Sequence, residues 1–362
     1  DGGIVAGYYT LQFGGSYVSS LMSRYDANGN LVSTQTIHSS NSTGVPGVYA
    51  IGNSGAYVGI TLDQTIDTAV YVQYVNASGV AASNVRLDYG SYGQNSDIPG
   101  GVTAVGNDGS FVVSWYSYDM NNSKGVICLQ KFNSAGAVVG GIVTADNDPT
   151  VANINNNPKL TSLSDGSFVL TWSADETGAS PNNDYSVYLQ KYNSNMELVS
   201  GTIKLEAPGN LTGTDSSPEI ASGPDGSFAV TWHGQDTAGN FQVYVRHYTA
   251  SELATPTLVS ASPVDNSYVA AGSDITLTFS APVTLGTSGT ITLKSLDGGS
   301  DIVINMASLG SNAVTVSGNT VTINPGSANE LLAGKNYAVQ ITAGAIKGAN
   351  GVSYTLSDTT TL

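Results

Sequence analysis

The chain of 362 residues has little charge, and positive charge is scarcest. Charged residues make up 10% of it, and 11 basic residues stand against 27 acidic ones, which gives a net charge of −16. Nucleic acid is therefore not expected as a partner, because phosphate binding needs a basic face. The acidity is typical of a secreted protein that must stay soluble, and it leaves divalent cations open as partners.

Thiols and long apolar runs are also scarce. Cys128 is the single cysteine, so no disulfide can form within the chain. No run of about 18 apolar residues occurs, so we expect no membrane insertion. No secretion signal is present, and we expect Asp1 to follow a processed or truncated start. The near-absence of cysteine is typical of long bacterial surface proteins, which favours an extracellular or cell-surface location.

The usual signatures of catalysis are missing. None of the three histidines, His38, His233 and His247, is paired with another at metal-ligand spacing. No nucleophile elbow, zinc-protease helix or phosphate-binding loop appears either. The sequence therefore predicts that the chain is not an enzyme.

Paired carboxylates are the exception that a glycosidase could use. The candidates are Asp175 with Glu176, and Asp146 with Asp148. Both pairs lie in turn-rich segments, where aspartate is expected for its turn chemistry alone. We therefore keep glycoside hydrolysis as an alternative and not as the main interpretation.

An internal repeat dominates the first 250 residues. Asp-Gly-Ser-Phe-Val-Val-Ser-Trp at 108–115 recurs with small changes at 165–172 and 225–232, and weaker copies start at Asp1 and Ser54. A second phrase, an aromatic residue followed by Asn-x-x-Gly, comes after each copy. The residue at the aromatic position of this phrase recurs every 50–60 residues, at Tyr25, Val75, Phe132, Tyr192 and Tyr248.

Both phrases predict hairpins. Asp-Gly between alternating apolar residues is a strong hairpin signal, because glycine accepts the positive φ of a tight turn. With a lead-in and an exit segment, each repeat becomes a four-stranded antiparallel unit that must stack on its neighbours. We predict an all-β fold with a β-propeller-like domain of about five blades over 1–250, or alternatively a stack of sandwich-like units. The units are expected near 1–47, 48–100, 101–157, 158–217 and 218–250.

The repeat phrase resembles the Asp-Gly-Ser-Phe-Val-Val-Thr-Trp repeats of large secreted bacterial proteins of the repeats-in-toxin and adhesin type. The resemblance is specific for the last three copies. The first unit is expected to lack its lead-in strand and the last its exit strand. Unpaired strand edges of this kind either pair with each other or accept another subunit, which would permit self-assembly.

A different segment follows a linker at 251–255. Alternating strands separated by Gly, Asn and Asp predict a β-sandwich over 256–362. Ser-Pro-Val-Asp-Asn at 262–266, Leu-Thr-Phe-Ser-Ala-Pro-Val at 277–283 and Gly-Ala-Ile-Lys at 344–347 resemble the bacterial Ig-like domain of S-layer proteins and adhesins. Gly348 stands where that family often has an acidic residue, so the resemblance implies no cation site there.

Trp115, Trp172 and Trp232 occupy the same place in their repeats. They predict an equivalent buried position between units, with a sugar-stacking platform as the alternative. An acidic residue follows each of them by four positions, namely Asp119, Glu176 and Asp236. Oxygen-rich loops of this kind can bind Ca²⁺, with simple turn chemistry as the alternative.

The leading functional hypothesis is an extracellular bacterial adhesin or a component of a surface layer or filament. Its expected partners are cell-surface glycans or further surface-protein subunits. The abundance of tyrosine, with 20 residues against 7 phenylalanines, favours a carbohydrate-binding lectin as an alternative. A third hypothesis is the non-catalytic part of a secreted hydrolase.

Overall fold

The computed structural model describes most of the chain, namely residues 4–11, 18–38, 47–51, 55–63, 69–89, 95–106, 108–119, 124–145, 153–175, 185–209, 213–250, 252–253, 256–264, 268, 270, 272–309, 313–325, 331–332, 334–348 and 351–356. The chain divides into two compact units. The repeat unit comprises Asp1–Leu198 and Lys204–His247, and the terminal unit comprises Val199–Ile203 and Tyr248–Leu362.

Among the described residues the repeats form five antiparallel sheets in chain order. The first sheet contains β1 (Ile4–Leu11), β2 (Val18–Tyr25) and β3 (Leu31–His38). The second contains β4 (Gly47–Ile51), β5 (Ala56–Asp63), β6 (Ala69–Val75) and β7 (Val85–Leu87). The third contains β8 (Asn95–Val105), β9 (Ser110–Asp119), β10 (Lys124–Phe132) and β11 (Val138–Thr144). In each sheet every strand pairs with the next one along the chain.

The fourth and fifth sheets repeat the same meander. The fourth contains β12 (Asn153–Ser162), β13 (Phe168–Asp175), β14 (Tyr185–Tyr192) and β15 (Ile203–Leu205). The fifth contains β16 (Asp215–Ser222), β17 (Phe228–Gln235) and β18 (Phe241–Tyr248). In the described part of the chain the first and fifth sheets therefore have three strands each, as the sequence predicts.

The turns form where the sequence places them. In the Asp-Gly turns, Gly109, Gly166 and Gly226 all have φ of 80°, a left-handed conformation that glycine adopts without strain. In the second type of turn, the side chain of the first residue accepts two backbone N–H groups. Asn133 Oδ1, for example, accepts from Ala135 N and Ala137 N at 3.0 Å each.

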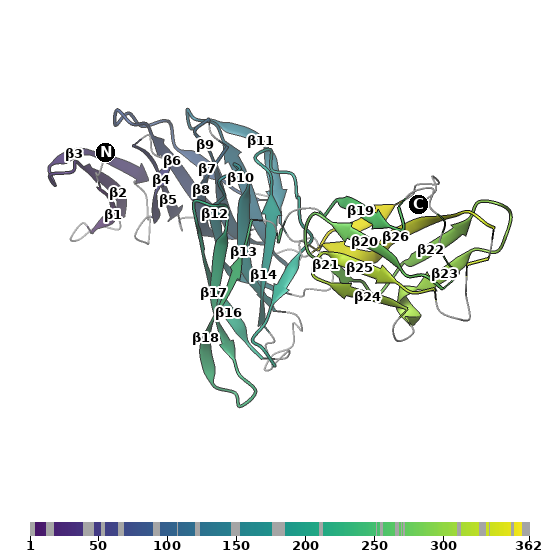
Figure 1. The fold of residues 1–362 in the computed structure, drawn as a ribbon. Coiled ribbons are helices and arrows are strands. Elements are labelled where there is room, and N and C mark those ends of the chain that lie inside the picture. Colours follow the sequence, from purple (N-terminus) through teal and green to yellow (C-terminus); the bar gives the residue numbers. More distant parts are fainter. Residues whose placement is uncertain are drawn as a thin grey trace. The chain divides into compact units, whose positions relative to one another are not determined.

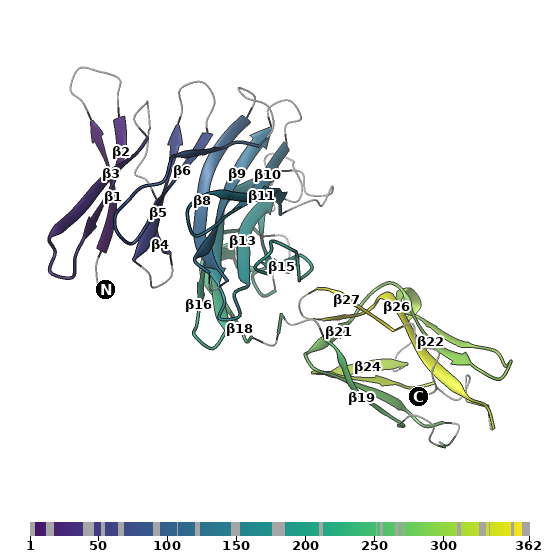
Figure 2. The same cartoon turned by 90° about the horizontal axis from the view of Figure 1, so that it is seen from above.

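Consecutive sheets of the repeat unit pack face to face, and Figures 1 and 2 show them side by side in chain order. Alternate residues of each strand point to opposite neighbours. Phe111 and Trp115 pack against the second sheet, whereas Val112 and Ile127 pack against the fourth. We call the face toward the preceding sheet the front face and the face toward the following sheet the back face. A strand such as β13 is consequently buried along its whole length.

The first strands of successive sheets approach one another closely. The hydroxyl of Tyr49 on β4 donates to the carbonyl of Gly100 on β8 at 3.0 Å. A Cβ at Gly100 would lie 2.4 Å from Pro158 on β12. Burial, and then the negative charge of Glu219 on β16, raise the pKa of Tyr49. Strands from four sheets thus converge on one region, which is a propeller-like arrangement.

The terminal unit is a two-sheet sandwich. One sheet has the order β19 (Leu258–Ser262), β20 (Ile275–Phe279), β25 (Thr320–Ile323) and β24 (Val314–Ser317). The other has the order β21 (Val283–Leu285), β26 (Tyr337–Gly348), β22 (Thr290–Ser295) and β23 (Ile302–Asn305), with β27 (Ser353–Leu356) paired to β26. A 3-10 turn, η1 (Met306–Ser308), follows β23.

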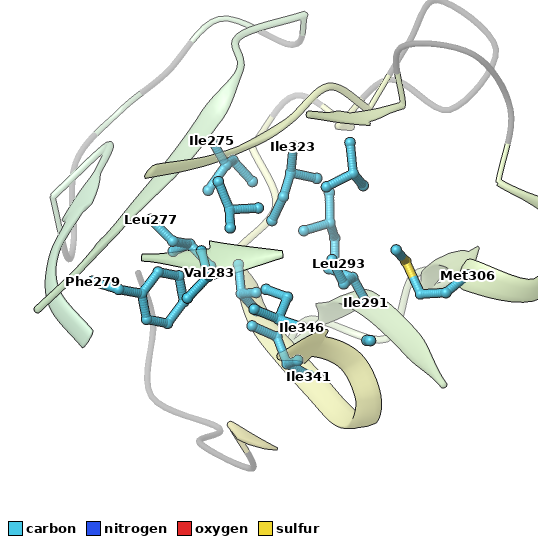
Figure 3. Close-up of a cluster of buried hydrophobic side chains, with 14 of the residues drawn as sticks. Ile275, Leu277, Phe279, Val283, Ile291, Leu293, Met306, Ile323, Ile341 and Ile346 are labelled. Atoms are coloured by element: carbon cyan, nitrogen blue, oxygen red, sulfur yellow. The ribbon is translucent and has the colours of Figure 1, made fainter. Parts of the chain in front are cut away.

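Apolar residues at every second position of these strands form the sandwich core. Ile275, Leu277 and Phe279 alternate with less buried threonines on β20. Ile291 and Leu293 do the same on β22, and Figure 3 shows these side chains meeting in one cluster. The predicted all-β fold, with five propeller-like repeats and an Ig-like sandwich, is confirmed.

No helix in the described residues is long and apolar enough to cross a membrane.

Candidate functional site

The three acidic residues predicted to bind Ca²⁺ have different places in the structure. Asp119 ends β9, but its side chain lies outside the described part of the chain, and so does the whole of Glu176. Asp236 lies in the tight turn between β17 and β18. Its Oδ1 accepts from Ala238 N and Asn240 N at 2.9 Å each. These two bonds are the turn chemistry that the sequence offered as the alternative at this position.

No group of three or more His, Cys, Asp or Glu side chains suited to a metal ion is found among the residues that the structure describes. The other predicted carboxylates, Asp146 and Asp148, fall outside those residues. Calcium binding therefore stays a prediction.

The three repeated tryptophans are buried between sheets. Trp115 packs on its front face against the second sheet, and Trp172 packs in the same way against the third. Trp232 is also buried, and it stacks on Tyr244 with ring centroids 5.8 Å apart. The predicted position between units is confirmed for Trp115 and Trp172, and the burial of all three tryptophans excludes a sugar-stacking platform made of them.

Three buried aspartates lie at the same end of their sheets, the end at which β9, β13 and β17 finish. Asp97 is the third residue of the lead-in strand of the third sheet, Asp215 begins that of the fifth, and Asp175 ends β13. Only Asp175 was singled out from the sequence. The signal for the other two was an aspartate two or three residues before a proline, in Asp-Ile-Pro99 and Asp-Ser-Ser-Pro218.

Asp215 is held in place by hydrogen bonds. Its Oδ1 accepts from the indole Nε1 of Trp232 at 2.9 Å, and its Oδ2 accepts from Ala207 N at 3.2 Å. A Cβ at Gly234 would lie 2.1 Å from Oδ1, so only glycine leaves room for the carboxylate. This carboxylate therefore has a structural role in the fifth sheet.

Asp97 lies near the only thiol of the chain. Burial raises the pKa of Cys128, and the negative charge of Asp97 raises it further. The thiol is thus held in its neutral form, which is neither a good nucleophile nor a metal ligand.

Half-buried tyrosines accompany Asp175 at this end of the third and fourth sheets. Tyr116 and Tyr118 lie near the end of β9, and Tyr185 begins β14 directly opposite Asp175. The ring of Tyr116 lies over Gly125, where a Cβ would be 2.5 Å from it. Tyr116 packs beside the cluster between the third and fourth sheets that contains Ala174. Asp175 follows Ala174 in the strand, so it points to the opposite face of the fourth sheet, together with its paired residue Tyr185. We call Tyr116, Tyr118, Asp175 and Tyr185 the tyrosine end.

The tyrosine end offers aromatic faces and hydroxyl groups from two sheets, with the buried carboxylate of Asp175 beside Tyr185. Burial, and to a lesser degree the neighbouring Tyr118, raise the pKa of Tyr116 to about 12, so its hydroxyl remains a donor at neutral pH. The carboxylate of Asp175 accepts hydrogen bonds when it is ionised. Aromatic surface beside donors and acceptors is suited to ligands with alternating apolar faces and hydroxyl groups.

Comparison with known proteins identifies the terminal unit. Residues 253–361 match the family of bacterial Ig-like domains, which confirms that part of the predicted resemblance. The relationship of the repeats to repeats-in-toxin proteins stays a prediction. No curated protein sequence matches the chain.

Several solved structures with similar folds are of enzymes. An endo-arabinase from Bacteroides thetaiotaomicron is 12% identical, with a TM-score of 0.37 over 68% of this chain and 94% of its own. An α-L-arabinanase from Penicillium chrysogenum, complexed with arabinobiose, is 13% identical, with a TM-score of 0.43 over 76% of this chain and 85% of its own. A GH43 endo-arabinanase from Bacillus licheniformis is 13% identical, with a TM-score of 0.35 over 68% of this chain and 94% of its own.

These structures correct the prediction that the chain is not an enzyme, because the proteins to which it is similar are enzymes. At such identities and TM-scores the similarity assigns neither a substrate nor catalytic residues to this chain. Those assignments have to come from its own side chains.

Proposed function

We propose that this chain is an extracellular bacterial carbohydrate-active protein whose repeat unit engages a polysaccharide at the tyrosine end. The observation that carries the proposal is that three half-buried tyrosines lie at the same end of the third and fourth sheets, and that one of them, Tyr185, is paired with Asp175. The bacterial Ig-like domain at 253–361 supports a surface or secreted location. The proposal includes the predicted adhesin role, since a polysaccharide of a cell surface is one such ligand.

Binding is tested by affinity electrophoresis and calorimetry with soluble polysaccharides, linear arabinan among them. We expect at least one to bind, and we expect Tyr118→Ala and Tyr185→Ala each to weaken binding about tenfold, or roughly 1.4 kcal/mol. The matched control is Tyr268→Ala, because Tyr268 is a fully exposed tyrosine of the terminal unit. Equal losses in all three variants would contradict a site at the tyrosine end.

Turnover is tested on the same polysaccharides by the release of reducing ends. Glycoside hydrolysis normally uses two carboxyl groups, and Asp175 is the described candidate at this end. Asp175→Asn should abolish release while leaving binding in place, because the amide keeps the size of the side chain but cannot exchange a proton at neutral pH. Release that is unchanged in this variant would show that catalysis lies elsewhere.

A further inference from the structure

The back face of the fifth sheet carries bare apolar side chains. Phe241, Val243 and Val245 on β18 are 61%, 71% and 67% exposed. They share one face, since they alternate along the strand. Tyr244 lies between them in sequence and points the other way, because it stacks on the front-facing Trp232. The three exposed side chains are therefore directed away from the fourth sheet.

The same positions are covered in the other repeats. The repeats can be aligned on Phe132, Tyr192 and Tyr248. In this alignment Val243 and Val245 correspond to Ile127 and Leu129 of the third sheet and to Val187 and Leu189 of the fourth. All four equivalents are 0% exposed. Ile127 and Leu129 belong to the cluster that the third sheet shares with the front face of the fourth. The back face of the fifth sheet thus has the composition of a face that another repeat covers.

The front face of the first sheet is also exposed at positions that a preceding sheet covers in the other repeats. Ile4 is 65% exposed, whereas its equivalents Phe111, Phe168 and Phe228 are at most 2% exposed. Gly29 shows the same difference, because a Cβ there would meet nothing within 4 Å. A Cβ at the equivalent Gly136 would lie 2.6 Å from Tyr74 of the preceding sheet.

A polar contact fixes the register between sheets. Arg24 of the first sheet donates to the carbonyl of Ala77 in a turn of the second at 2.6 Å. Lys131 of the third sheet donates to the equivalent carbonyl, that of Ser194 in the fourth, at 2.7 Å. The residue at the Arg24 and Lys131 position in the fifth sheet is His247, again a nitrogen donor. The equivalent acceptor in the first sheet is the carbonyl of Ala27.

We propose that the back face of the fifth sheet binds the front face of the first sheet of a second copy of this chain. Both faces are exposed at once in the structure, so the chain's own first sheet does not cover the fifth. The contact would continue the sheet-on-sheet packing already present between the third and fourth sheets. It joins two different surfaces, so it is heterologous, and successive copies add head to tail, into a ring if the rotation between them closes and into an open chain if it does not. It is independent of the tyrosine end.

The test uses one blocking variant for each face. Val245→Glu blocks the back face of the fifth sheet and Ile4→Glu blocks the front face of the first. Each places a charge where an apolar contact is expected. Sedimentation and light scattering over a concentration series should show a mass that rises with concentration in the unaltered chain and stays monomeric in each variant. Val303→Glu, an exposed position on β23 of the terminal unit, should associate like the unaltered chain.

Mixing the two blocked variants distinguishes this contact from any symmetric one. Each variant retains one intact face of the opposite kind, so an equimolar mixture should give a dimer and nothing larger. Circular dichroism and melting of each variant verify that it is folded. A chain that is monomeric at every concentration would overturn the proposal, as would a mixture of folded variants that remains monomeric.

Discussion

The indole nitrogens of the repeated tryptophans differ although their rings are equivalent. Trp232 donates to the buried carboxylate of Asp215, whereas the Nε1 atoms of Trp115 and Trp172 are buried with no hydrogen-bond partner among the described residues. The rings serve packing in all three sheets, and the polar contact belongs to the fifth sheet alone. Replacement by phenylalanine separates the two effects, because it removes the nitrogen and keeps an aromatic ring.

We expect Trp232→Phe to destabilise the protein more than Trp172→Phe does. Both variants lose ring volume, but only the first leaves a buried acceptor without its donor, which costs about 1–3 kcal/mol. Unfolding in denaturant, monitored by circular dichroism, measures the difference. Equal losses in the two variants would mean that the bond to Asp215 contributes nothing net.

Gly29 and Gly136 form a second matched pair. They occupy the same turn position, with φ of 83° and 77°, but only Gly136 lies against a neighbouring sheet. Gly29→Ala should cost roughly 1–2 kcal/mol from the left-handed backbone alone. Gly136→Ala should cost a further 1–3 kcal/mol, because Tyr74 must move. Melting temperatures of the two variants test this, and a smaller loss at Gly136 would contradict the close contact.

Sequence reasoning at this scale found residues that repeat and missed those that do not. The tryptophans were recognised because their position recurs three times. Asp97 and Asp215 were missed because the fourth sheet has no aspartate at the equivalent place, so no period marks them. Burial, which makes these carboxylates notable, depends on the neighbouring sheet and cannot be read from the strand itself.

Hairpin turns are the elements that the sequence specifies best. Asp26, Asn76, Asn133, Asn193 and Asp236 each accept backbone N–H groups two and four residues further on. Aspartate and asparagine offer the same acceptor oxygen, which explains their exchange at this position. They differ in that only aspartate titrates.

The first of these turns should make stability depend on pH. Hydrogen bonds from the side chain and backbone of Asn30 hold the pKa of Asp26 below its ordinary value. A lowered pKa in the folded state gives stability that is present above the unfolded value, near pH 4, and is lost as the pH falls through the folded value. Asp26→Asn should remove this part of the acid sensitivity, together with the stability that the charged carboxylate provides at neutral pH. Melting at pH 7 and pH 3 compares the two proteins, and an identical acid loss would contradict this role.

Strand faces were harder to predict than strand positions. Alternation is clear in the terminal unit, where each strand has one buried face. In the repeats both faces are buried, so β13 reads as a continuous run with no buried side to identify. The sequence therefore predicted hairpins and their order, but not which residues face the preceding or the following sheet.

The two compact units should unfold separately, because each has its own hydrophobic core. Leu293→Ala removes a fully buried side chain from the sandwich and should cost roughly 2–5 kcal/mol there. Calorimetry should show two transitions, of which only one moves to lower temperature in the variant. A single transition that shifts as a whole would show that the units unfold together.

At the scale of the molecule, composition and period predicted the class of fold but not its biochemical consequence. The absence of familiar catalytic motifs led to the prediction of a protein without activity, which the similar solved structures correct. Motif searches detect residues that are close in sequence. The tyrosine end joins Tyr116 and Tyr118 of β9 with Asp175 and Tyr185 of the next sheet, which are more than fifty residues further along the chain.

The repeated use of one contact between neighbouring sheets has an evolutionary consequence. Because Arg24 and Lys131 reach the same turn carbonyl in the next repeat, a gene that gains or loses a whole repeat by unequal recombination creates no new type of interface. Removing residues 25–131, for instance, would join Arg24 to Phe132, and Arg24 would then face the carbonyl of Ser194 that Lys131 now reaches. Descendants of this gene can therefore differ in the number of repeats and still use the same contact between neighbouring sheets.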